Sequence, residues 1–307
     1  MKDNTKISIM VITYNHENYI AKALESILMQ ETTYAYEVII GEDCSTDHTM
    51  DVIMKYKKRF GKKMHLLARQ KNVGMMRNVL ECLDYCKGEY IAFLEGDDYW
   101  TDPHKLQTQV DYMEKHNACI LTSHGWMIVD REERIVSKAH MSPERHVYDF
   151  EQFVSYELPG QASTWMVRNE IDKIRKECMP LLKKYFWIVP DRSITFVLLL
   201  YGEIHILPEN MSAYRYVIEK DGQNWSSKHD VEARHNFISI SIQMIGLEHM
   251  AKKKNITLDF YETRKYVLKK SRKYYRETHN KWIWIQGVLL FLLEPQKIRL
   301  LKELFHA

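Results

Sequence analysis

The chain has few of the residues that mark fibrous or low-complexity proteins, with 11 Gly and 7 Pro among 307 residues. These low counts exclude a collagen-like or Pro/Gly-rich disordered chain. No apolar run reaches the ~18 residues that a membrane-spanning helix needs, so we expect no transmembrane helix. The first residues, MKDNTKISIM, are charged and lack an apolar stretch with a small-residue cleavage site. We therefore expect no secretory signal peptide.

Cysteine and histidine lack the spacings of disulfide frameworks and metal motifs. Five Cys, an odd number without framework spacing, fit a reducing cytoplasm. Cys82 and Cys86 lie one helical turn apart without a second Cys or His pair nearby, so we interpret them as buried packing residues. The 14 His form no HExxH-like pattern. There is no zinc-finger spacing, RNP-like strand or heptad zipper, so we expect no nucleic-acid partner.

The composition that is present is that of a globular protein with a large core. Hydrophobic residues make up 45% and charged residues 28%. The net charge of +3 hides an asymmetry: residues 251–307 hold 14 Lys and Arg but 5 Asp and Glu, a net of +9, whereas residues 1–250 carry a net of −6. An acidic body with a basic tail suggests that the tail meets an anionic partner.

The first third of the chain alternates strand-like and helix-like segments. We expect strands at Ile7 to Ile12, Glu37 to Ile40, Met64 to Ala68 and Tyr90 to Leu94. We expect helices at Ala21 to Gln30, Asp47 to Phe60 and Asn78 to Lys87, the last of them capped by Gly88. Repeated βα units favour right-handed crossovers and a doubly wound, mostly parallel α/β sheet flanked by helices.

The rest of the chain is less regular. We expect strands at Cys119 to Val129, Ser163 to Val167 and Ile204 to Leu207, a polar excursion at Arg131 to His146, and a helix at Asp191 to Tyr201. From about His229 the pattern is largely helical.

Polar residues follow three of the expected strands, in TYNHENY (13–19), EDCSTDHT (42–49) and EGDDYW (95–100). Ligands of doubly wound sheets bind beyond the carboxyl ends of the strands. The sheet would therefore gather Thr13, Tyr14, Asn15, Asp43, Asp97 and Asp98 in one crevice. Carboxylates that share a cleft repel one another unless a cation joins them, which favours a hard divalent ion that also holds phosphate.

At these residues the sequence resembles the family 2 glycosyltransferases, which have the GT-A fold. The matching segments are SIMVITYNHENYIAKALESILMQ (8–30), VIIGEDCSTDHTMDVI (38–53), NVG (72–74) and GEYIAFLEGDDYWTDPHKLQTQ (88–109). A further segment, PDRSITFVLLLYGEIHILPENMSAYR (190–215), looks like the second-half signature of the family. Five segments in order and in register make the resemblance specific, and it covers roughly residues 5–225.

The resemblance implies an inverting transferase of the hexosyl or N-acetylhexosaminyl class that uses a UDP-sugar with Mg2+ or Mn2+. Carried over by position, Thr13 and Tyr14 would meet the base, Asp43 would bond the uracil ring, and Asp97 would lie near the ribose or sugar. Asp98 would bind the metal, and Asp191 would be the general base. Asn15, Asn72 and Arg77 would complete the nucleotide-sugar site. Glu42 departs from the family's first Asp.

Each of these residues also has a plain structural interpretation. Asp97 and Asp98 could cap the helix that begins near Pro103, and Asp191 could cap its own helix after Pro190. Asp43 could initiate a turn, Tyr14 could be a packing aromatic, and Arg77 could be a solvated cation. Gln161, Ser163 and Thr164 could line the acceptor pocket or serve as turn and cap residues.

The resemblance divides the chain into a GT-A domain at residues 1–225 and a basic helical extension at residues 226–307. Within the domain, residues 1–118 would hold the nucleotide-sugar and residues 119–225 the acceptor, a saccharide or lipid-linked saccharide of bacterial-type surface polysaccharide or glycolipid assembly. A nucleotidyltransferase is one alternative, but a Gly-rich phosphate loop is missing after the first strand. A non-catalytic sugar-nucleotide-binding module is another.

The basic tail contains KKK (252–254) and KKSRKYYR (269–276), followed by the 12 apolar-rich residues WIWIQGVLLFLL (282–293). This stretch is too short to span a bilayer, but an aromatic start beside Lys281 resembles an interfacial anchor. Three interpretations stay open: a helix packed on the catalytic domain, attachment to the anionic inner face of the cytoplasmic membrane, or an oligomer contact.

Overall fold

The computed structural model describes residues 5–139, 147–155, 157–170, 176, 190–217, 237–294, 296 and 298–299. The chain forms two compact units. Unit 1 comprises residues 1–149, 158–176 and 197–217, and unit 2 comprises residues 150–157, 177–196 and 218–307. The boundary expected at residues 225 and 226 lies outside the described residues, so that division stays a prediction.

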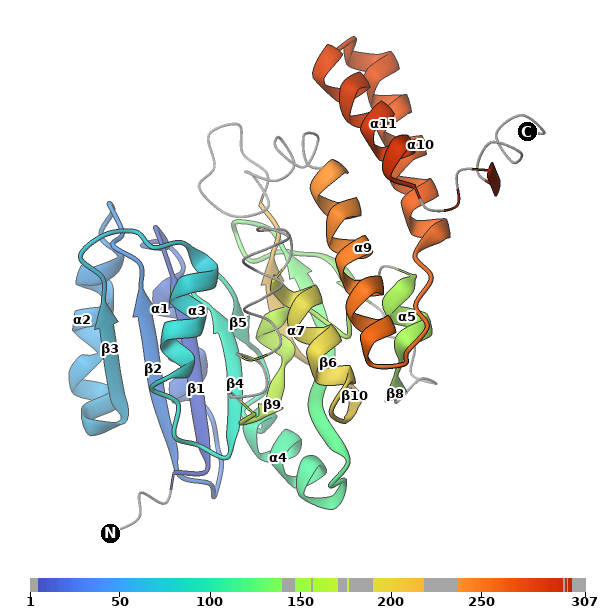
Figure 1. Ribbon diagram of the computed structural model, residues 1–307. Coiled ribbons are helices and arrows are strands. Elements are labelled where there is room, and N and C mark those ends of the chain that lie inside the picture. The colour runs from blue at the N-terminus through green and yellow to red at the C-terminus, as the bar shows by residue number, and fades with distance from the viewer. Residues whose placement is uncertain are drawn as a thin grey trace. The chain divides into compact units, whose positions relative to one another are not determined.

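Unit 1 is built on a mixed sheet whose first half is parallel. Its strands run side by side in the order β3 (Met64–Ala68), β2 (Tyr36–Glu42), β1 (Ile7–Thr13) and β4 (Tyr90–Glu95) (Figure 1). β1 and β4 are almost entirely buried, which explains their continuous apolar sequences. The chain runs outward from β1 to β3 and then returns to β4 on the other side of β1, which is the expected doubly wound order.

Three helices connect these strands: α1 (Ile20–Leu28), α2 (Thr49–Phe60) and α3 (Met75–Leu83). α1 buries side chains at helical spacing, namely Ile20, Ala23, Leu24 and Ile27. α1 contacts α2, whereas α3 contacts β1 and β2. With right-handed crossovers, α1 and α2 cover one face of the sheet and α3 covers the other.

The second half of the sheet mixes strand directions. Short β9 (Met166–Arg168) is antiparallel to both β4 and β6 (Cys119–Val129), and β6 is parallel to β10 (Glu203–Arg215). Three short strands complete it: β5 (Tyr99–Trp100), β7 (Ile135–Ala139) and β8 (Val147–Tyr148). Helix α4 (Lys105–Lys115) and the 3-10 turns η1 (Gly61–Lys63) and η2 (Ala162–Thr164) complete the connections of unit 1.

Several expected boundaries were wrong in ways that have a physical reason. The polar segment after β6 forms β7, because its Ile135 to Ala139 pair with β6 as a hairpin. The strand expected from Ser163 begins only at Met166, because residues 162–164 form η2. The strand expected at Ile204 to Leu207 continues to Arg215 through register shifts that interrupt its apolar pattern.

Gly88 does not cap a helix, since α3 ends at Leu83. It lies against β1 instead: a Cβ atom on Gly88 would be 2.5 Å from the backbone N of Ser8 and 2.7 Å from the carbonyl C of Ile7. The N–H of Gly88 donates to Oγ of Ser8 at 2.8 Å. Glycine is therefore required here for the close approach of two backbones.

Unit 2 gathers α5 (Phe150–Val154) with α9 (Phe237–Lys253), α10 (Tyr261–Thr278) and α11 (Lys281–Leu293). α7 (Pro190–Leu199) begins in this unit. The ring of Phe153 lies 5.9 Å from that of Phe196 and 5.7 Å from that of Phe260, centroid to centroid. The helical character expected for the C-terminal part is confirmed for α9 to α11, while His229 lies outside the described residues.

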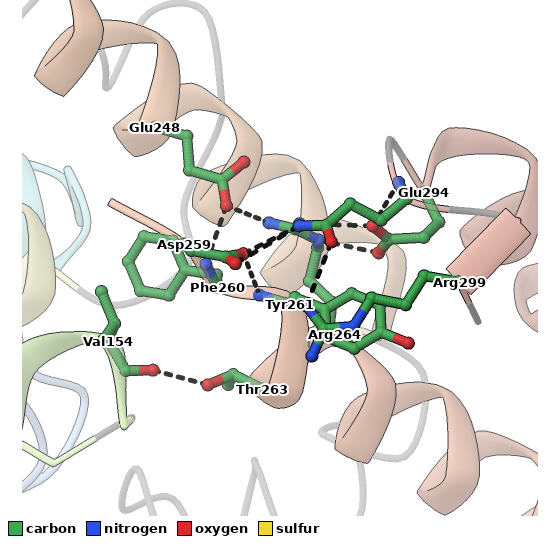
Figure 2. A network of polar contacts seen from close by, with 10 residues as sticks. Val154, Glu248, Asp259, Phe260, Tyr261, Thr263, Arg264, Glu294 and Arg299 are labelled. Atoms are coloured by element: carbon green, nitrogen blue, oxygen red, sulfur yellow. Dashed lines mark hydrogen bonds and ion pairs between the residues drawn. The ribbon is translucent and has the colours of Figure 1, made fainter. Parts of the chain in front are cut away.

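A buried cation joins the three C-terminal helices (Figure 2). Arg264 of α10 is ion-paired to Glu248 of α9, and its Nε donates to Oε2 of Glu294 at 2.9 Å. Glu248 also accepts the N–H of Phe260 at 2.8 Å, which fixes the turn before α10. Burial acts to lower the pKa of Arg264, but the bonds to Glu294 and Glu248 outweigh it and raise the pKa, so the guanidinium stays charged. One side chain therefore fixes the relative positions of α9, α10 and the end of α11.

Replacement of Gly88 by Ala is expected to destabilise unit 1 by about 1–3 kcal/mol, the usual cost of forcing an extra carbon into a packed site. Urea unfolding followed by tryptophan fluorescence measures this loss. Lys62→Ala in η1 is the control, because the Lys62 side chain is exposed in the same unit and its loss opens no packed site. An unchanged midpoint for Gly88→Ala would contradict the close approach.

Candidate active site

The carboxyl ends of β1, β2 and β4 lie next to one another, because β1 pairs with β2 on one side and with β4 on the other. The N–H of Asp43 donates to the carbonyl of Thr13 at 3.1 Å, and the N–H of Gly96 donates to the carbonyl of Ile12 at 2.9 Å. The three polar segments that follow these strands therefore meet at one edge of the sheet. Thr13 is buried there, and Tyr14 is half-buried.

Asn15 braces two of these segments. Its φ of 56° lies in the left-handed region, which Asn tolerates better than most residues. Its N–H donates to Oγ of Ser45 at 3.0 Å, and its Oδ1 accepts the N–H of Thr46 at 2.8 Å. Two further hydrogen bonds join the same two segments: the N–H of Glu17 donates to Asp47, and the N–H of His48 donates to Glu17. Asn15 is thus placed to hold the shape of the site.

Asp43 holds a third segment in place. Its carboxylate is buried and accepts the N–H of Val73 at 2.8 Å and the N–H of Gly74 at 2.9 Å. The exposed Asn72 caps the same turn, since its Oδ1 accepts the N–H of Gly74 at 3.1 Å. Each oxygen of Asp43 has a second lone pair for another donor. The segment NVG is therefore fixed against the end of β2.

Glu42 is longer than the Asp that the family often has at this position, and the extra length is used locally. Its Oε2 accepts the N–H of Cys44 at 3.2 Å, and its Oε1 accepts the N–H of Ser45 at 2.7 Å. Cys44 has a φ of 60°, so the turn is strained for a residue other than Gly or Asn. The carboxylate of Glu42 stabilises that turn.

Asp97 is the accessible member of the acidic pair. Its side chain is 16% exposed, and its Oδ2 lies 3.7 Å from Nε2 of His16. The preceding Gly96 allows this approach, because a Cβ there would lie 2.6 Å from Oγ1 of Thr13 and 2.8 Å from Nδ1 of His16. Asp97 thus presents a partly exposed carboxylate beside the end of β1.

Asp98 is 1% exposed, and protein donors engage both of its oxygens. Oδ1 accepts the N–H of Arg215 at 2.9 Å, while Oδ2 accepts Oγ–H of Ser163 at 2.7 Å and Nε2–H of Gln161 at 3.1 Å. Burial raises the pKa of Asp98 above its ordinary value, and the negative charge of Asp97 adds to the rise, whereas the three donors act against it. Asp98 therefore anchors the turn of residues 95–98, which we call the acidic turn.

Arg215 is the functional residue that sequence reasoning missed. Its side chain is buried, its Nε donates to the carbonyl of Asp97 at 3.0 Å, and its NH1 donates to the carbonyls of Asp130 and Arg131. The guanidinium also lies 4.5 Å from the ring centroid of Tyr19. Its position at the end of the family-like segment 190–215 was a signal that could have found it. It connects the acidic turn to the hairpin of β6 and β7.

Gln161, Ser163 and Thr164 make contacts that fit a turn and cap role, which is one of their two interpretations. Ser163 bonds Asp98 and also accepts the N–H of Glu95 at 3.1 Å. Gln161 is held by its own Oε1, which accepts the N–H of Ser163 at 2.8 Å. Thr164 donates to the carbonyl of Gln161 at 2.7 Å. Gln161 thus caps η2, which contains Ser163 and Thr164 and supports the acidic turn.

Two arginines lie near the NVG turn. Arg77 is exposed, and its Nε donates to Oε1 of Glu81 at 2.6 Å along α3. Arg69, which follows β3, pairs with the other oxygen of Glu81 at 2.7 Å and donates to Asn78. The structure thus gives Arg77 an ion-pair partner on its own helix.

Asp191 lies in the first turn of α7, within unit 2. Its side chain is half-buried, and desolvation raises its pKa to about 6. A carboxylate with such a pKa is well matched to taking a proton near neutral pH.

The two aspartates of the acidic turn, Asp97 and Asp98, are the candidates for binding a metal ion. Among the residues that it describes, no three His, Cys, Asp or Glu side chains lie close enough to hold a metal ion by themselves. Mg2+ does not need such a cage, since it is often held by one or two carboxylates together with substrate phosphates. The partly exposed carboxylate of Asp97 fits that mode of binding.

Replacement of Asp98 by Asn is expected to destabilise the fold by about 1.5–3 kcal/mol, because the new NH2 group would face the amide NH2 of Gln161 or leave the N–H of Arg215 without its acceptor. Asp97→Asn is the matched control one residue away, and its partly exposed side chain predicts little change. Denaturant unfolding of both variants measures the difference. Equal stability of the two would contradict the anchoring role of Asp98.

Comparisons with known proteins identify the family. The sequence model of the protein family described as Glycosyl transferase family 2 matches residues 8–173, which is more than half of the 307-residue chain. The uncharacterized protein Rv1520 of Mycobacterium tuberculosis is 33% identical over 210 residues, covering 68% of this chain and 58% of that protein. The poly(ribitol-phosphate) beta-N-acetylglucosaminyltransferase TarS of Staphylococcus aureus is 32% identical over 118 residues, 38% of this chain and 20% of TarS. The chain thus spans less than two thirds of these relatives.

Solved structures confirm the fold. The crystal structure of S. aureus TarS 1-349 in complex with UDP-GlcNAc matches with a TM-score of 0.58 and 18% identity, covering 86% of this chain and 71% of that one. The complex of TarS 1-349 with UDP matches with a TM-score of 0.56. The predicted GT-A type α/β fold is therefore confirmed. The matched residues 8–173 include the acidic turn and the loops that follow β1 and β2. The chain therefore belongs to glycosyl transferase family 2.

Proposed function

We propose that this glycosyltransferase moves a hexosyl or N-acetylhexosaminyl group from a UDP-sugar to an acceptor hydroxyl, with inversion at the anomeric carbon. The observation that carries the proposal is the arrangement of the acidic turn: a partly exposed Asp97 is presented by a buried, fully bonded Asp98. Loops joined by backbone hydrogen bonds surround it, which suits a site that must hold a diphosphate in one orientation.

A uridine nucleotide is supported from two sides. The printed titles of the TarS structures name UDP and UDP-GlcNAc as bound to that protein. In this chain, each oxygen of Asp43 keeps a lone pair that can accept the N3–H of uracil. We propose that Asp43 and Tyr14 recognise the base, with Thr13 and Asn72 beside them. Asn15 shapes this pocket through its two bonds to the neighbouring segment.

The metal assignment moves by one residue in this proposal. The family resemblance implies Asp98 as the metal ligand, but the Asp98 carboxylate is buried and bonded by three protein donors. Asp97 is the more accessible acid of the turn, so we propose that it holds Mg2+ or Mn2+ together with the donor phosphates. The ion would supply stabilisation of the charge that develops on the departing diphosphate. Asp98 and Arg215 would position Asp97.

Asp191 is proposed as the general base. The acceptor hydroxyl is a weak nucleophile until its proton is removed, and a carboxylate with a pKa of about 6 is ionised at neutral pH while still basic enough to accept that proton. Arg77, paired with Glu81, could reach the diphosphate only by giving up that partner. We therefore give Arg77 a lesser part in donor binding.

The proposed acceptor is a saccharide or lipid-linked saccharide used in bacterial-type surface polysaccharide or glycolipid assembly. The support is the name of the relative TarS, which describes transfer of N-acetylglucosamine to poly(ribitol-phosphate). We propose a cytoplasmic reaction, in keeping with cysteines 44, 82, 86 and 119, which are free thiols. Screening UDP-sugars by release of UDP tests the function directly.

Asp97→Asn should weaken UDP binding in the presence of Mn2+ by at least about tenfold, because an amide replaces the anionic ligand of a divalent ion. Binding without metal should change little. Calorimetric titration with UDP, with Mn2+ and then with EDTA, measures both values. Asp51→Asn is the control, since Asp51 is an exposed acid on α2 of the same unit. Full turnover in EDTA, or unchanged Mn2+-dependent binding by Asp97→Asn, would contradict the metal role.

The pH profile of turnover tests Asp191. The base acts only when ionised, and its pKa is about 6, so kcat should fall about tenfold per pH unit below that value. Asp191→Asn should lower kcat by roughly 10²-fold or more and leave UDP affinity nearly unchanged. If Asp191→Asn retained kcat within a few-fold and the same acid limb, another residue would be the base. UDP binding without turnover on any donor would favour a non-catalytic module.

A further inference from the structure

Helix α11 of unit 2 exposes its apolar side chains. Five of them are between 38% and 55% exposed: Trp282, Ile285, Val288, Leu289 and Leu292. Residues 282, 285, 289 and 292 follow the 3-4-3 spacing of one helical face. With a rise of 1.5 Å per residue they form a stripe of about 15 Å. Single exposed apolar residues are common, but a continuous stripe marks an interaction surface.

Other side chains of α11 are buried, and one of them is polar. Gln286 is 1% exposed, and neither its Oε1 nor its Nε2 has a hydrogen-bond partner among the described residues. Ile283 and Glu294 are buried as well. α11 therefore turns an amide inward and a row of apolar side chains outward, the reverse of a helix whose outer face meets only water.

This orientation of α11 is fixed by the surrounding contacts. Asn280 caps the helix, since its Oδ1 accepts the N–H of Trp282 at 2.9 Å. At the other end, the carboxylate of Glu294 is bonded to the buried Arg264 of α10 (Figure 2). Gly287 faces α10 closely, because a Cβ there would lie 3.4 Å from Oγ of Ser271. The apolar stripe is therefore held in an outward position.

The neighbouring helix α10 adds positive charge. Its exposed residues include five cations: Lys269, Lys270, Arg272, Lys273 and Arg276. One acid, Glu277, lies among them and reaches Lys273 at 3.9 Å. Residues 251–307 carry 14 Lys and Arg against 5 Asp and Glu. α10 and α11 are consecutive helices in contact with each other, so an apolar stripe and a cationic helix belong to one hairpin.

We propose that the hairpin of α10 and α11 docks on the surface of an anionic lipid bilayer, with the stripe of α11 inserted at the headgroup boundary. Exposed apolar side chains with an aromatic residue, beside Lys and Arg, are the features of helices that lie in the membrane interface. A second copy of the chain fits less well, because its hairpin would bring the same positive charge. None of the described helices is long and apolar enough to cross a membrane.

The docking surface is independent of the proposed reaction, so its test needs no donor or acceptor. The full chain is mixed with phosphatidylcholine vesicles, with or without phosphatidylglycerol, and separated by flotation at low and high salt. We expect flotation with phosphatidylglycerol at low salt and a marked loss at high salt. Each cation near such a surface strengthens binding about fivefold, so Lys269→Gln, Lys270→Gln and Lys273→Gln together should weaken it about a hundredfold.

The apolar stripe is tested by Ile285→Ser, Leu289→Ser and Leu292→Ser combined. These side chains are exposed, so the variant should keep its thermal unfolding midpoint while losing flotation. Met54→Ser on α2 of unit 1 is the control, since Met54 is exposed to a similar degree, and it should float like the original chain. A second readout avoids any folding ambiguity: brominated lipids should quench tryptophan fluorescence of the original chain more strongly than that of Trp282→Phe.

Three outcomes would overturn the proposal. The full chain could ignore phosphatidylglycerol vesicles at low salt. It could float equally with and without phosphatidylglycerol, which would remove the role of α10. It could also form a dimer in light scattering that the triple Ser variant dissociates, without any vesicle binding, which would make the stripe a contact between copies.

Discussion

The acidic turn depends on one buried carboxylate, that of Asp98. It receives donors from η2 and from the end of β10, so it joins segments that are far apart in the chain. Removing a carboxylate from water is costly unless hydrogen bonds replace the lost hydration. Asp98 accepts three such bonds, which fix its position. Because Asp97 is the preceding residue, its backbone is fixed as well. Asp97 and Asp98 have the same side chain, so their different surroundings follow from their different burial.

The remaining loops of the site are held by similar means. Side chains bond to the backbone N–H groups of neighbouring loops, as Asn15 does with Thr46, Asp43 with Gly74 and Glu42 with Ser45. Loops that are ordered before a ligand arrives lose less conformational entropy when it binds. In the proposed function, these contacts would hold the lone pairs of Asp43 in position before the nucleotide binds. A rigid donor pocket is thus compatible with loops that carry little regular secondary structure.

Much of the fold could be read from the sequence because buried parallel strands are continuous apolar runs. The limits of Cys119–Val129 and Met64–Ala68 were predicted to the residue. The site was predictable as far as strand order places residues together. The different environments of Asp97 and Asp98 were not, because the donors to Asp98 come from residues 63 to 117 positions away. The orientation of α11 was also beyond the sequence, since an almost wholly apolar helix has no stripe to indicate its inner face.

The separation of Asp98 and Arg215 in the sequence also has a consequence for folding during synthesis. The chain emerges from the ribosome with its amino-terminal end first, and domains fold as units during synthesis. β1 to β4 can pair early, since all four lie within the first 95 residues. The N–H that completes the bonding of Asp98, however, is 117 residues further along. The nascent chain must therefore carry an acidic turn with an unfinished anchor until β10 has been synthesised, and this interval is when a chaperone would have most to protect.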